Sequence, residues 1–114
     1  MNLLDTDVIL QIIKEKKEAP GAMYTITLIE ILRGIDAKKR TKTKELLEES
    51  FSLLELNNKT VETYCTLYGK LRETGSLIPD ADLLIAATAI ANNMTLETGN
   101  EHFQRLTQLG LQLK

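Results

Sequence analysis

The segment from Leu83 to Ala91 constrains the fold of this chain more than any other segment, because it has almost no polar side chains that could face solvent. Thr88 is its only polar residue, and Pro79 stands shortly before it, at a position where helices commonly begin. A helix that is apolar on every side is buried, and alanines let it approach a sheet closely. The segment is far too short to cross a bilayer. We therefore expect a helix over residues 80–92 that packs inside a globular domain, without membrane association.

Short apolar segments with strand character alternate with helical segments along the rest of the chain. Thr27 and Glu30 match the capping-box signature that opens a helix, and Gly34 is placed to end it. Such alternation predicts an α/β fold, with a central, mainly parallel sheet and helices on both faces. The predicted strands cover residues 2–4, 23–26, 51–56, 95–98 and 111–113, and the predicted helices cover 7–13, 27–33, 43–50, 61–72 and 80–92.

The length of 114 residues suits one compact domain that spans residues 1–114. Cys65 is the only cysteine, which excludes an intrachain disulfide and a cysteine-based zinc site and fits a cytoplasmic location. Asp5 and Asp7 interrupt the apolar N-terminal segment, so we expect no signal peptide. The formal net charge of −2 gives no general attraction to nucleic acid, so a nucleic-acid function must rest on local features.

Three acidic residues stand in apolar surroundings, where carboxylates are rare without a partner. Asp5 follows the first predicted strand, Glu30 lies within an apolar helix, and Asp82 precedes the apolar segment described above. No lysine or arginine lies within four residues of Asp5 or Asp82, and Arg33 is the only such neighbour of Glu30. Acids without cationic partners can share a hard cation such as Mg²⁺ or Mn²⁺. We expect the three carboxylates to meet at one edge of the sheet, close enough to share an ion.

Four motifs, over residues 3–7, 27–34, 80–89 and 96–103, resemble in order and spacing the motifs of PIN-domain toxins of the VapC type. The resemblance covers nearly the whole chain. It implies a metal-dependent endoribonuclease in which Asp5, Glu30 and Asp82 bind the metal. The fourth acidic position of the family falls on Asn100, which joins these three in the candidate catalytic set. Candidate supporting residues are Thr6 and Thr98, which match polar positions of the family, and Asp80, a possible extra ligand.

The resemblance also implies partners, because toxins of this type usually come with an antitoxin and pair as homodimers. We expect a cognate antitoxin protein that brings an arginine to the acidic edge in place of the metal. We also expect it to lay an apolar helix beside Ile29, Leu32 and the short first helix. The face formed by Tyr64, Tyr68 and Leu71 is the predicted dimer interface.

A basic cluster follows Glu30 in the sequence and supplies six of the fourteen lysines and arginines. Its functional interpretation is contact with the phosphates of an RNA substrate, and its structural interpretation is an exposed, solvated turn. The cluster comprises Arg33, Lys38, Lys39, Arg40, Lys42 and Lys44, of which Lys38, Lys39 and Arg40 are the RNA-binding candidates.

Two other functions remain open at this stage. Asp5, Thr6 and Asp7, followed by Val8, resemble the start of the D-x-D-x-V pattern of haloacid-dehalogenase-type phosphatases, with Asp5 as the nucleophile. That interpretation leaves Glu30 without a role, and the chain is short for that fold. A catalytically silent PIN domain that only binds is the other alternative, and Asn100 is its only support.

Each candidate also has a purely structural alternative. Asp5 or Asp7 could cap the first helix, and Glu30 could complete the capping box of its own helix. The remaining alternatives are a favourable charge in a first helical turn for Asp82, a turn residue for Asn100 and a solvated side chain for His102, the only histidine.

Overall fold

In the computed structural model, which describes residues 1–114, five short parallel strands form a single sheet. The strands lie side by side in the order β3-β2-β1-β4-β5. Each pair of neighbours is parallel, which confirms the predicted fold class. The strands are β1 (Leu3–Leu4), β2 (Ala22–Tyr24), β3 (Ser52–Leu54), β4 (Thr95–Glu97) and β5 (Gln112–Leu113).

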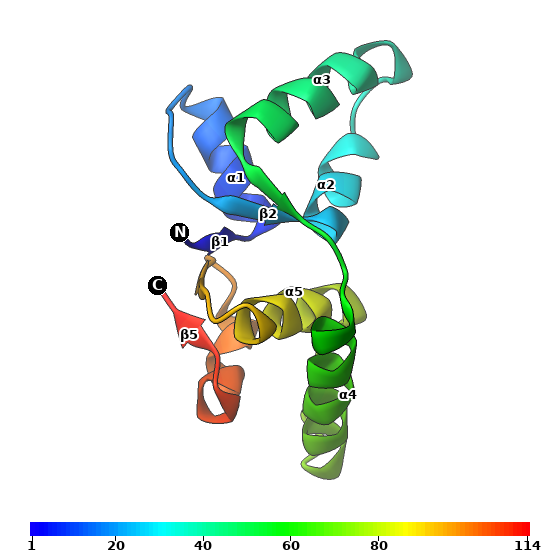
Figure 1. Cartoon of the computed structure of the whole chain (residues 1–114), viewed down its shortest axis with the longest axis vertical. Coiled ribbons are helices and arrows are strands. Elements are labelled where there is room, and N and C mark those ends of the chain that lie inside the picture. The colour runs from blue at the N-terminus through cyan, green and yellow to red at the C-terminus, as the bar shows by residue number, and fades with distance from the viewer.

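Helices cover both faces of this sheet (Figure 1). One layer contains α1 (Thr6–Lys14), α2 (Thr25–Leu32) and α3 (Ala37–Ser50). The other contains α4 (Asn58–Glu73), α5 (Asp80–Ala91) and η1 (Glu101–Leu109), the last being a 3₁₀ helix. None of these helices combines the length and the apolarity that crossing a membrane requires.

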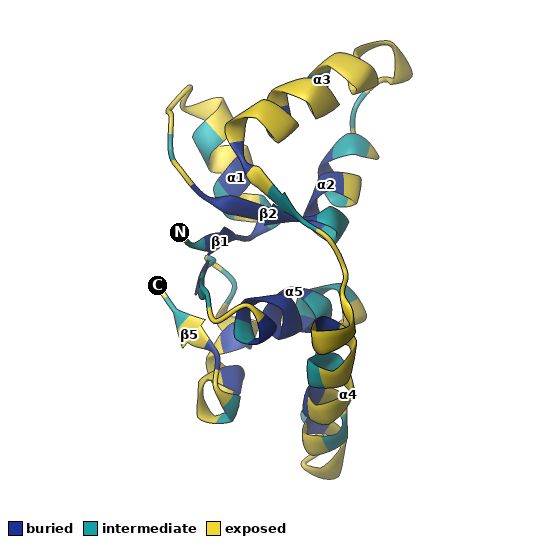
Figure 2. Ribbon diagram, in the orientation of Figure 1, coloured by how far each residue is buried: buried dark blue, intermediate teal, exposed yellow.

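Alternate strand residues face the two layers, so the sheet separates two cores. Leu4 and Met23 belong to a cluster of 7 buried residues under α1, α2 and α3. Leu3 and Tyr24 belong to a cluster of 15 buried residues on the opposite face. Helix α5 lies against this second face and is buried along most of its length, as its sequence predicts (Figure 2).

The start of α2 differs from the sequence prediction. Strand β2 ends at Tyr24, where pairing with Leu54 of β3 ends, and the Thr25 hydroxyl donates to the Leu54 carbonyl at 3.0 Å. The helix therefore begins at Thr25, and Thr27 is already inside its first turn and fully buried. The predicted capping box between Thr27 and Glu30 does not form, which leaves the Glu30 carboxylate free for other contacts.

The first part of α3, before the helix predicted over residues 43–50, and the whole of η1 were not predicted as helical. Helix α3 begins at Ala37 after the N-cap Asp36, so most of the basic cluster lies on an exposed helix and not in a turn. Leu47 is the only buried residue of α3, which is why its sequence shows no clear apolar periodicity. The helix η1 was missed because its buried residues, Phe103 and Leu106, follow the three-residue spacing of a 3₁₀ helix.

Candidate metal centre

The carboxyl ends of β1 and β4 lie side by side at the point where the chain connectivity of the sheet reverses. From β1 the chain proceeds to β2 on one side, whereas β4 and β5 lie on the other side. Ligands of open α/β sheets bind at such a point. Asp5 directly follows β1, and its backbone N–H donates to the carbonyl of Glu97, the last residue of β4, at 2.9 Å. Residues from both strand ends, and from the helices that start nearby, form the candidate site.

Asp5 is buried, with only 6% of its surface exposed, and both of its carboxylate oxygens accept hydrogen bonds. The backbone N–H of Thr6 donates to Oδ1 at 2.8 Å, and the hydroxyl of Thr98 donates to Oδ2 at 2.7 Å. Asp5 is thus the N-cap of α1, as its structural alternative expects. Burial raises the pKa of Asp5 above its ordinary value, and the nearby charges of Asp7 and Asp82 raise this pKa further against the opposing effect of the two hydrogen bonds.

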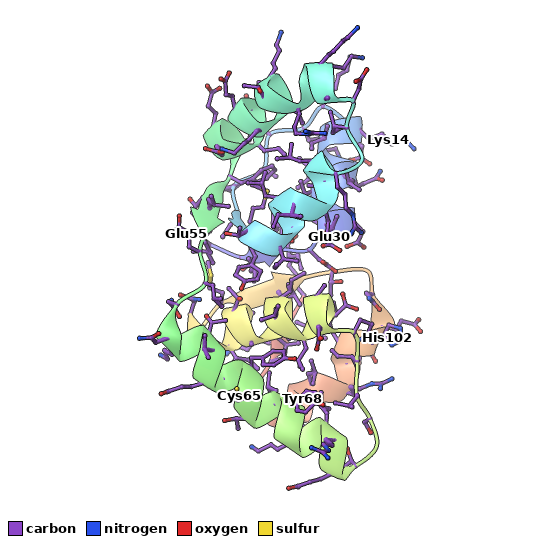
Figure 3. The ribbon with its side chains drawn as sticks, turned by 90° about the vertical axis from the view of Figure 1, so that its right-hand side faces the viewer. Lys14, Glu30, Glu55, Cys65, Tyr68 and His102 are labelled. Atoms are coloured by element: carbon purple, nitrogen blue, oxygen red, sulfur yellow. The ribbon has the colours of Figure 1, made fainter.

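Glu30 approaches the same place from α2. Its Oε1 accepts a hydrogen bond from the Thr6 hydroxyl at 2.9 Å. Thr6 therefore contacts two acids at once, Asp5 through its backbone and Glu30 through its side chain. Seen from the side of the molecule, Glu30 and His102 lie in the two opposite helical layers, and both are well separated from Glu55 (Figure 3).

Asp82 comes from the first turn of α5 and is half-buried. The side-chain amide of Asn100 lies 3.5 Å from its Oδ2 and is directed as a donor. The Asn100 oxygen accepts from the backbone N–H of His102 at 2.9 Å, so Asn100 also caps η1. Burial raises the pKa of Asp82, and the charge of Glu30 raises it further, whereas His102 lowers it.

These acids line one open pocket of about 360 Å³. No lysine, arginine or histidine is among the lining residues. The lining residues are Asp5, Thr6, Asp7, Leu10, Glu30, Asp82, Gly99 and Asn100.

The three predicted ligands share this pocket, but their carboxylates do not converge on one point. No group of three or more acidic, histidine or cysteine side chains is close enough together to hold a metal ion. The expectation that the three carboxylates lie within sharing distance of one ion was therefore wrong for the side-chain positions in this structure. The physical reason is that like charges repel, so each carboxylate turns to a neutral donor: Asp5 to Thr98, Glu30 to Thr6 and Asp82 to Asn100.

The donor set nevertheless fits a hard divalent cation. The pocket offers carboxylate, hydroxyl and amide oxygens, which are the ligands that Mg²⁺ and Mn²⁺ prefer. It offers no sulfur or imidazole nitrogen. Burial raises the pKa values of Asp5 and Asp82, and neighbouring carboxylates raise them further, so positive charge in the pocket would stabilise both carboxylates. A bound cation would supply that positive charge.

Two predicted groups lie outside the pocket. Asp80 accepts a hydrogen bond from the Tyr64 hydroxyl at 2.6 Å, which raises the pKa of Tyr64 to about 12. Asp80 and Asp82 are two positions apart on α5, and this spacing turns their side chains to opposite sides of a helix. The second group consists of Lys38, Lys39 and Arg40, which are exposed on α3.

Asp7 and Gly99 belong to the pocket, although the sequence did not indicate it. Asp7 was one of two candidates to cap the first helix, and Asp5 is the cap. The Oδ2 of Asp7 instead accepts from the backbone N–H of Gly99 at 3.0 Å. No signal in the sequence could reveal this bond, because the donor is a backbone amide 92 residues further along the chain.

The chain is similar to known proteins in both sequence and structure. The PIN domain family matches residues 3–109. Ribonuclease VapC1 of Methanocaldococcus jannaschii is 36% identical over 115 residues, which cover 97% of this chain and 85% of that protein. Among solved structures, VapBC-1 from nontypeable Haemophilus influenzae superposes with a TM-score of 0.85 at 27% identity, over 99% of this chain and 96% of that one. VapBC2 from Rickettsia felis, bound to a DNA fragment from its promoter, gives a TM-score of 0.83 at 25% identity, over 99% and 96% of the respective chains.

Proposed function

We infer that this chain, which belongs to the PIN domain family, is an endoribonuclease and the toxin of a toxin–antitoxin pair. The observation that carries the inference is the 36% identity to a ribonuclease of the VapC type across 97% of the chain. The acidic pocket at the carboxyl ends of β1 and β4 gives this activity a physical location. We further propose that cleavage depends on Mg²⁺ or Mn²⁺ and takes place in the cytoplasm.

In this proposal Asp5, Glu30 and Asp82 would hold the cation, whose charge would offset the repulsion that keeps the three carboxylates apart. When bound, Mg²⁺ or Mn²⁺ supplies activation of a water molecule and neutralisation of the charge that develops on the phosphate. Thr98 and the backbone of Thr6 fix the rotamer of Asp5. The Thr6 hydroxyl keeps Glu30 beside Asp5. The protein thus holds the ligands in place through neutral donors, which add no competing positive charge.

Asn100 has a supporting part in the same proposal. Its side-chain amide faces Asp82, and its oxygen is engaged by the start of η1. The engaged oxygen makes Asn100 a poor direct ligand. We therefore propose that Asn100 orients Asp82 and does not bind the cation directly.

The stability of the protein without metal offers a first test at Asp82. Because burial raises its pKa above 3.8 in the folded state, that state binds more protons than the unfolded one between the two pKa values. Stability therefore falls as pH rises through this window and stays lowered above it. Asp82→Asn removes the penalty, so at pH 7 the metal-free variant should melt no lower than wild type. Any advantage should disappear below about pH 3.8.

Metal should reverse this order of stability. At a free Mn²⁺ concentration of 100 times the dissociation constant, wild type should gain about 2.7 kcal/mol, and Asp82→Asn much less at the same concentration. Thermal melting with and without Mn²⁺, in chelator-treated protein, measures both quantities. Equal stabilisation of wild type and variant would remove Asp82 from the ligand set.

The three basic residues at the start of α3 are proposed to contact RNA phosphates. Each lost contact with single-stranded RNA should reduce the slope of log affinity against log salt by about 0.7. Replacing Lys38, Lys39 and Arg40 together by alanine should therefore weaken binding most at low salt. The measurement is a salt titration of RNA binding in the cleavage-deficient Asp82→Asn background.

A control with the same change in net charge is available on α4. Lys59, Lys70 and Arg72 are exposed there, on the helix that packs on the opposite face of the sheet. Their combined replacement by alanine should leave the salt slope unchanged. If both triple variants change the slope equally, the α3 cluster has no specific role in RNA binding.

The antitoxin partner is proposed to cover apolar surface beside the acidic pocket. Leu10, Ile13 and Ile29 are each about half exposed on α1 and α2, and Leu10 also lines the pocket. A partly apolar groove of about 1030 Å³ lies between α1 and α3, lined among others by Ile13 and Leu46. An apolar helix of the partner would fill this groove, and its arginine would reach the acids. The relatives solved as VapBC complexes support such pairing.

A homodimer is also proposed, with one correction to its predicted interface. Leu71 is buried in the core of the monomer and is not available to a second copy. Tyr64 and Tyr68 stack with their ring centroids 6.1 Å apart, and Tyr68 is exposed on α4. The proposed interface is therefore the tyrosine pair and its exposed neighbours on α4 (Figure 3).

The two alternative functions are not favoured. A phosphatase centred on Asp5 leaves Glu30 without a role, yet Glu30 and Asp5 line one pocket and both contact Thr6. The PIN domain family also matches nearly the whole chain. A silent PIN domain rests only on Asn100, whose amide faces Asp82 and leaves the other three acids in place. Metal-dependent cleavage of RNA by the purified protein decides against both alternatives.

A further inference from the structure

Asp7 and Gly99 make a close contact between the start of α1 and the loop that follows β4. The Gly99 backbone N–H donates to Asp7 Oδ2 at 3.0 Å. A Cβ atom added at Gly99 would lie 2.7 Å from the same oxygen, which is closer than real Cβ contacts allow. Gly99 does not have a left-handed backbone conformation, so its φ angle is no reason for a glycine there. An alanine at Gly99 would therefore have to displace the Asp7 carboxylate.

This contact differs from the other bonds that hold the same loop. The Thr98 hydroxyl donates to Asp5, and the Asn100 N–H donates to the Thr98 hydroxyl oxygen at 3.0 Å. The first of these bonds depends on Asp5, whose oxygens the proposed function assigns to the cation. The bond to Asp7 uses an oxygen from outside that ligand set. It can therefore hold the loop in place whether or not Asp5 changes its partners.

We propose that Asp7 is a positioning residue, which fixes loop residues 98–100 so that Asn100 faces Asp82 across the acidic pocket. The role of the pocket in this inference rests on the proposed function. The bond between Asp7 and Gly99 is observed in the structure and does not depend on that function. Asp7 acts as a hydrogen-bond acceptor and not as a ligand or a catalytic group. Its effect on the reaction passes through the loop to Asn100, and from Asn100 to Asp82.

Two variants of Asp7 separate an acceptor role from a charge or ligand role. Asp7→Asn keeps an oxygen that can accept from Gly99 but removes the charge, whereas Asp7→Ala removes both. Three quantities are measured: hydrogen exchange of the Gly99 amide, Mn²⁺ affinity by calorimetry and the kcat of RNA cleavage. Asp7→Ala should lose the protection of the Gly99 amide and bind Mn²⁺ about 10- to 100-fold more weakly, the range for lost support of a metal ligand. Asp7→Asn should keep the protection of the Gly99 amide, and because it removes only one charge near Asp5, its losses in Mn²⁺ affinity and kcat should be clearly smaller than those of Asp7→Ala.

A double-mutant cycle tests the contact from its other side. Gly99→Ala should weaken Mn²⁺ binding in the wild-type background, because the new methyl group displaces the Asp7 carboxylate. In the Asp7→Ala background the same substitution should have little further effect, since the obstructing oxygen is gone. Gly69→Ala is the matched control, because a Cβ at Gly69 meets nothing within 4 Å. Melting temperatures of all variants check that the fold is kept.

Each result supports or overturns the proposal. Losses in Asp7→Asn as large as those in Asp7→Ala would make Asp7 a ligand or charge contributor and overturn it. Additive losses in the cycle, or full Gly99 protection in Asp7→Ala, would also overturn it. The amide exchange does not depend on activity, so it tests the contact even if the wild type fails to cleave RNA, a result that would instead refute the proposed function.

Discussion

Asp82→Asn is expected to reduce RNA cleavage by at least about 100-fold, because loss of a metal ligand should exceed the 10- to 100-fold effect of losing a residue that supports one. The substitution keeps the shape of the side chain and its contact distance to Asn100, and it removes only the charge and one acceptor oxygen. Asp82 is half-buried at the start of α5 and carries no structural bond other than the long one to Asn100. The fold should therefore remain intact. Single-turnover cleavage of RNA with Mg²⁺ or Mn²⁺ is the measurement.

Asp80→Asn provides the comparison on the same helical turn. Asp80 is two positions away and bonds to Tyr64 outside the pocket, so its substitution should leave most of the cleavage activity. Asp5→Asn and Glu30→Gln should behave like Asp82→Asn. Wild-type cleavage by Asp82→Asn in protein of unchanged melting temperature would refute the mechanism proposed here.

Expression of the wild-type chain without its antitoxin is expected to arrest the growth of its host. A ribonuclease whose acidic pocket is open to solvent needs restraint from another molecule. Co-expression of the antitoxin should restore growth, and the two proteins should co-purify. Asp82→Asn should be tolerated at the same level of soluble protein. If cells also tolerate high expression of the wild type and no neighbouring gene product binds it, the toxin function fails, although a free-standing RNA-processing enzyme would remain possible.

Substitutions in the groove between α1 and α3 test where the antitoxin binds. Ile13 and Leu46 line the groove and are 46% and 55% exposed, so glutamine at both positions should disturb the monomer little. The double variant should cleave RNA as before but lose co-purification with the antitoxin. Leu77→Gln is a control, because Leu77 is similarly exposed, at 46%, in the segment between α4 and α5. Undiminished binding of the double variant would place the antitoxin elsewhere.

The sequence predicted the layers of this fold better than the limits of its helices. A helix as apolar as α5 must lie in the interior of a globular domain, so its burial follows from its composition alone. The start of α2 depends on where β2 stops pairing with β3, which is a contact between Tyr24 and Leu54 across 30 residues of chain. The local signature at Thr27 carries no information about that contact. Long-range pairing therefore overrode a correctly recognised local pattern.

In the site, too, the sequence predicted what depends on local pattern and not what depends on long-range contacts. The sequence indicated Asp5, Glu30 and Asp82 as ligands because acids are unusual among apolar neighbours. All three line the pocket. Asp7 is exposed and has an ordinary place at the start of a helix, so only its spatial neighbour Gly99 distinguishes it. The separation of the carboxylates was also beyond sequence reasoning, because it depends on which hydroxyl or amide each one meets.

The unequal cores on the two faces of the sheet have a consequence for heat inactivation. Glu30 belongs to the layer that rests on 7 buried residues, and Asp82 belongs to the layer that rests on 15. Partial opening of a structure starts where fewest buried contacts must be broken, which here is the layer of α1, α2 and α3. Such opening separates Glu30 from Asp82 while α4, α5 and η1 stay packed on the larger core. Warming should therefore extinguish nuclease activity before the circular dichroism of the helices is fully lost.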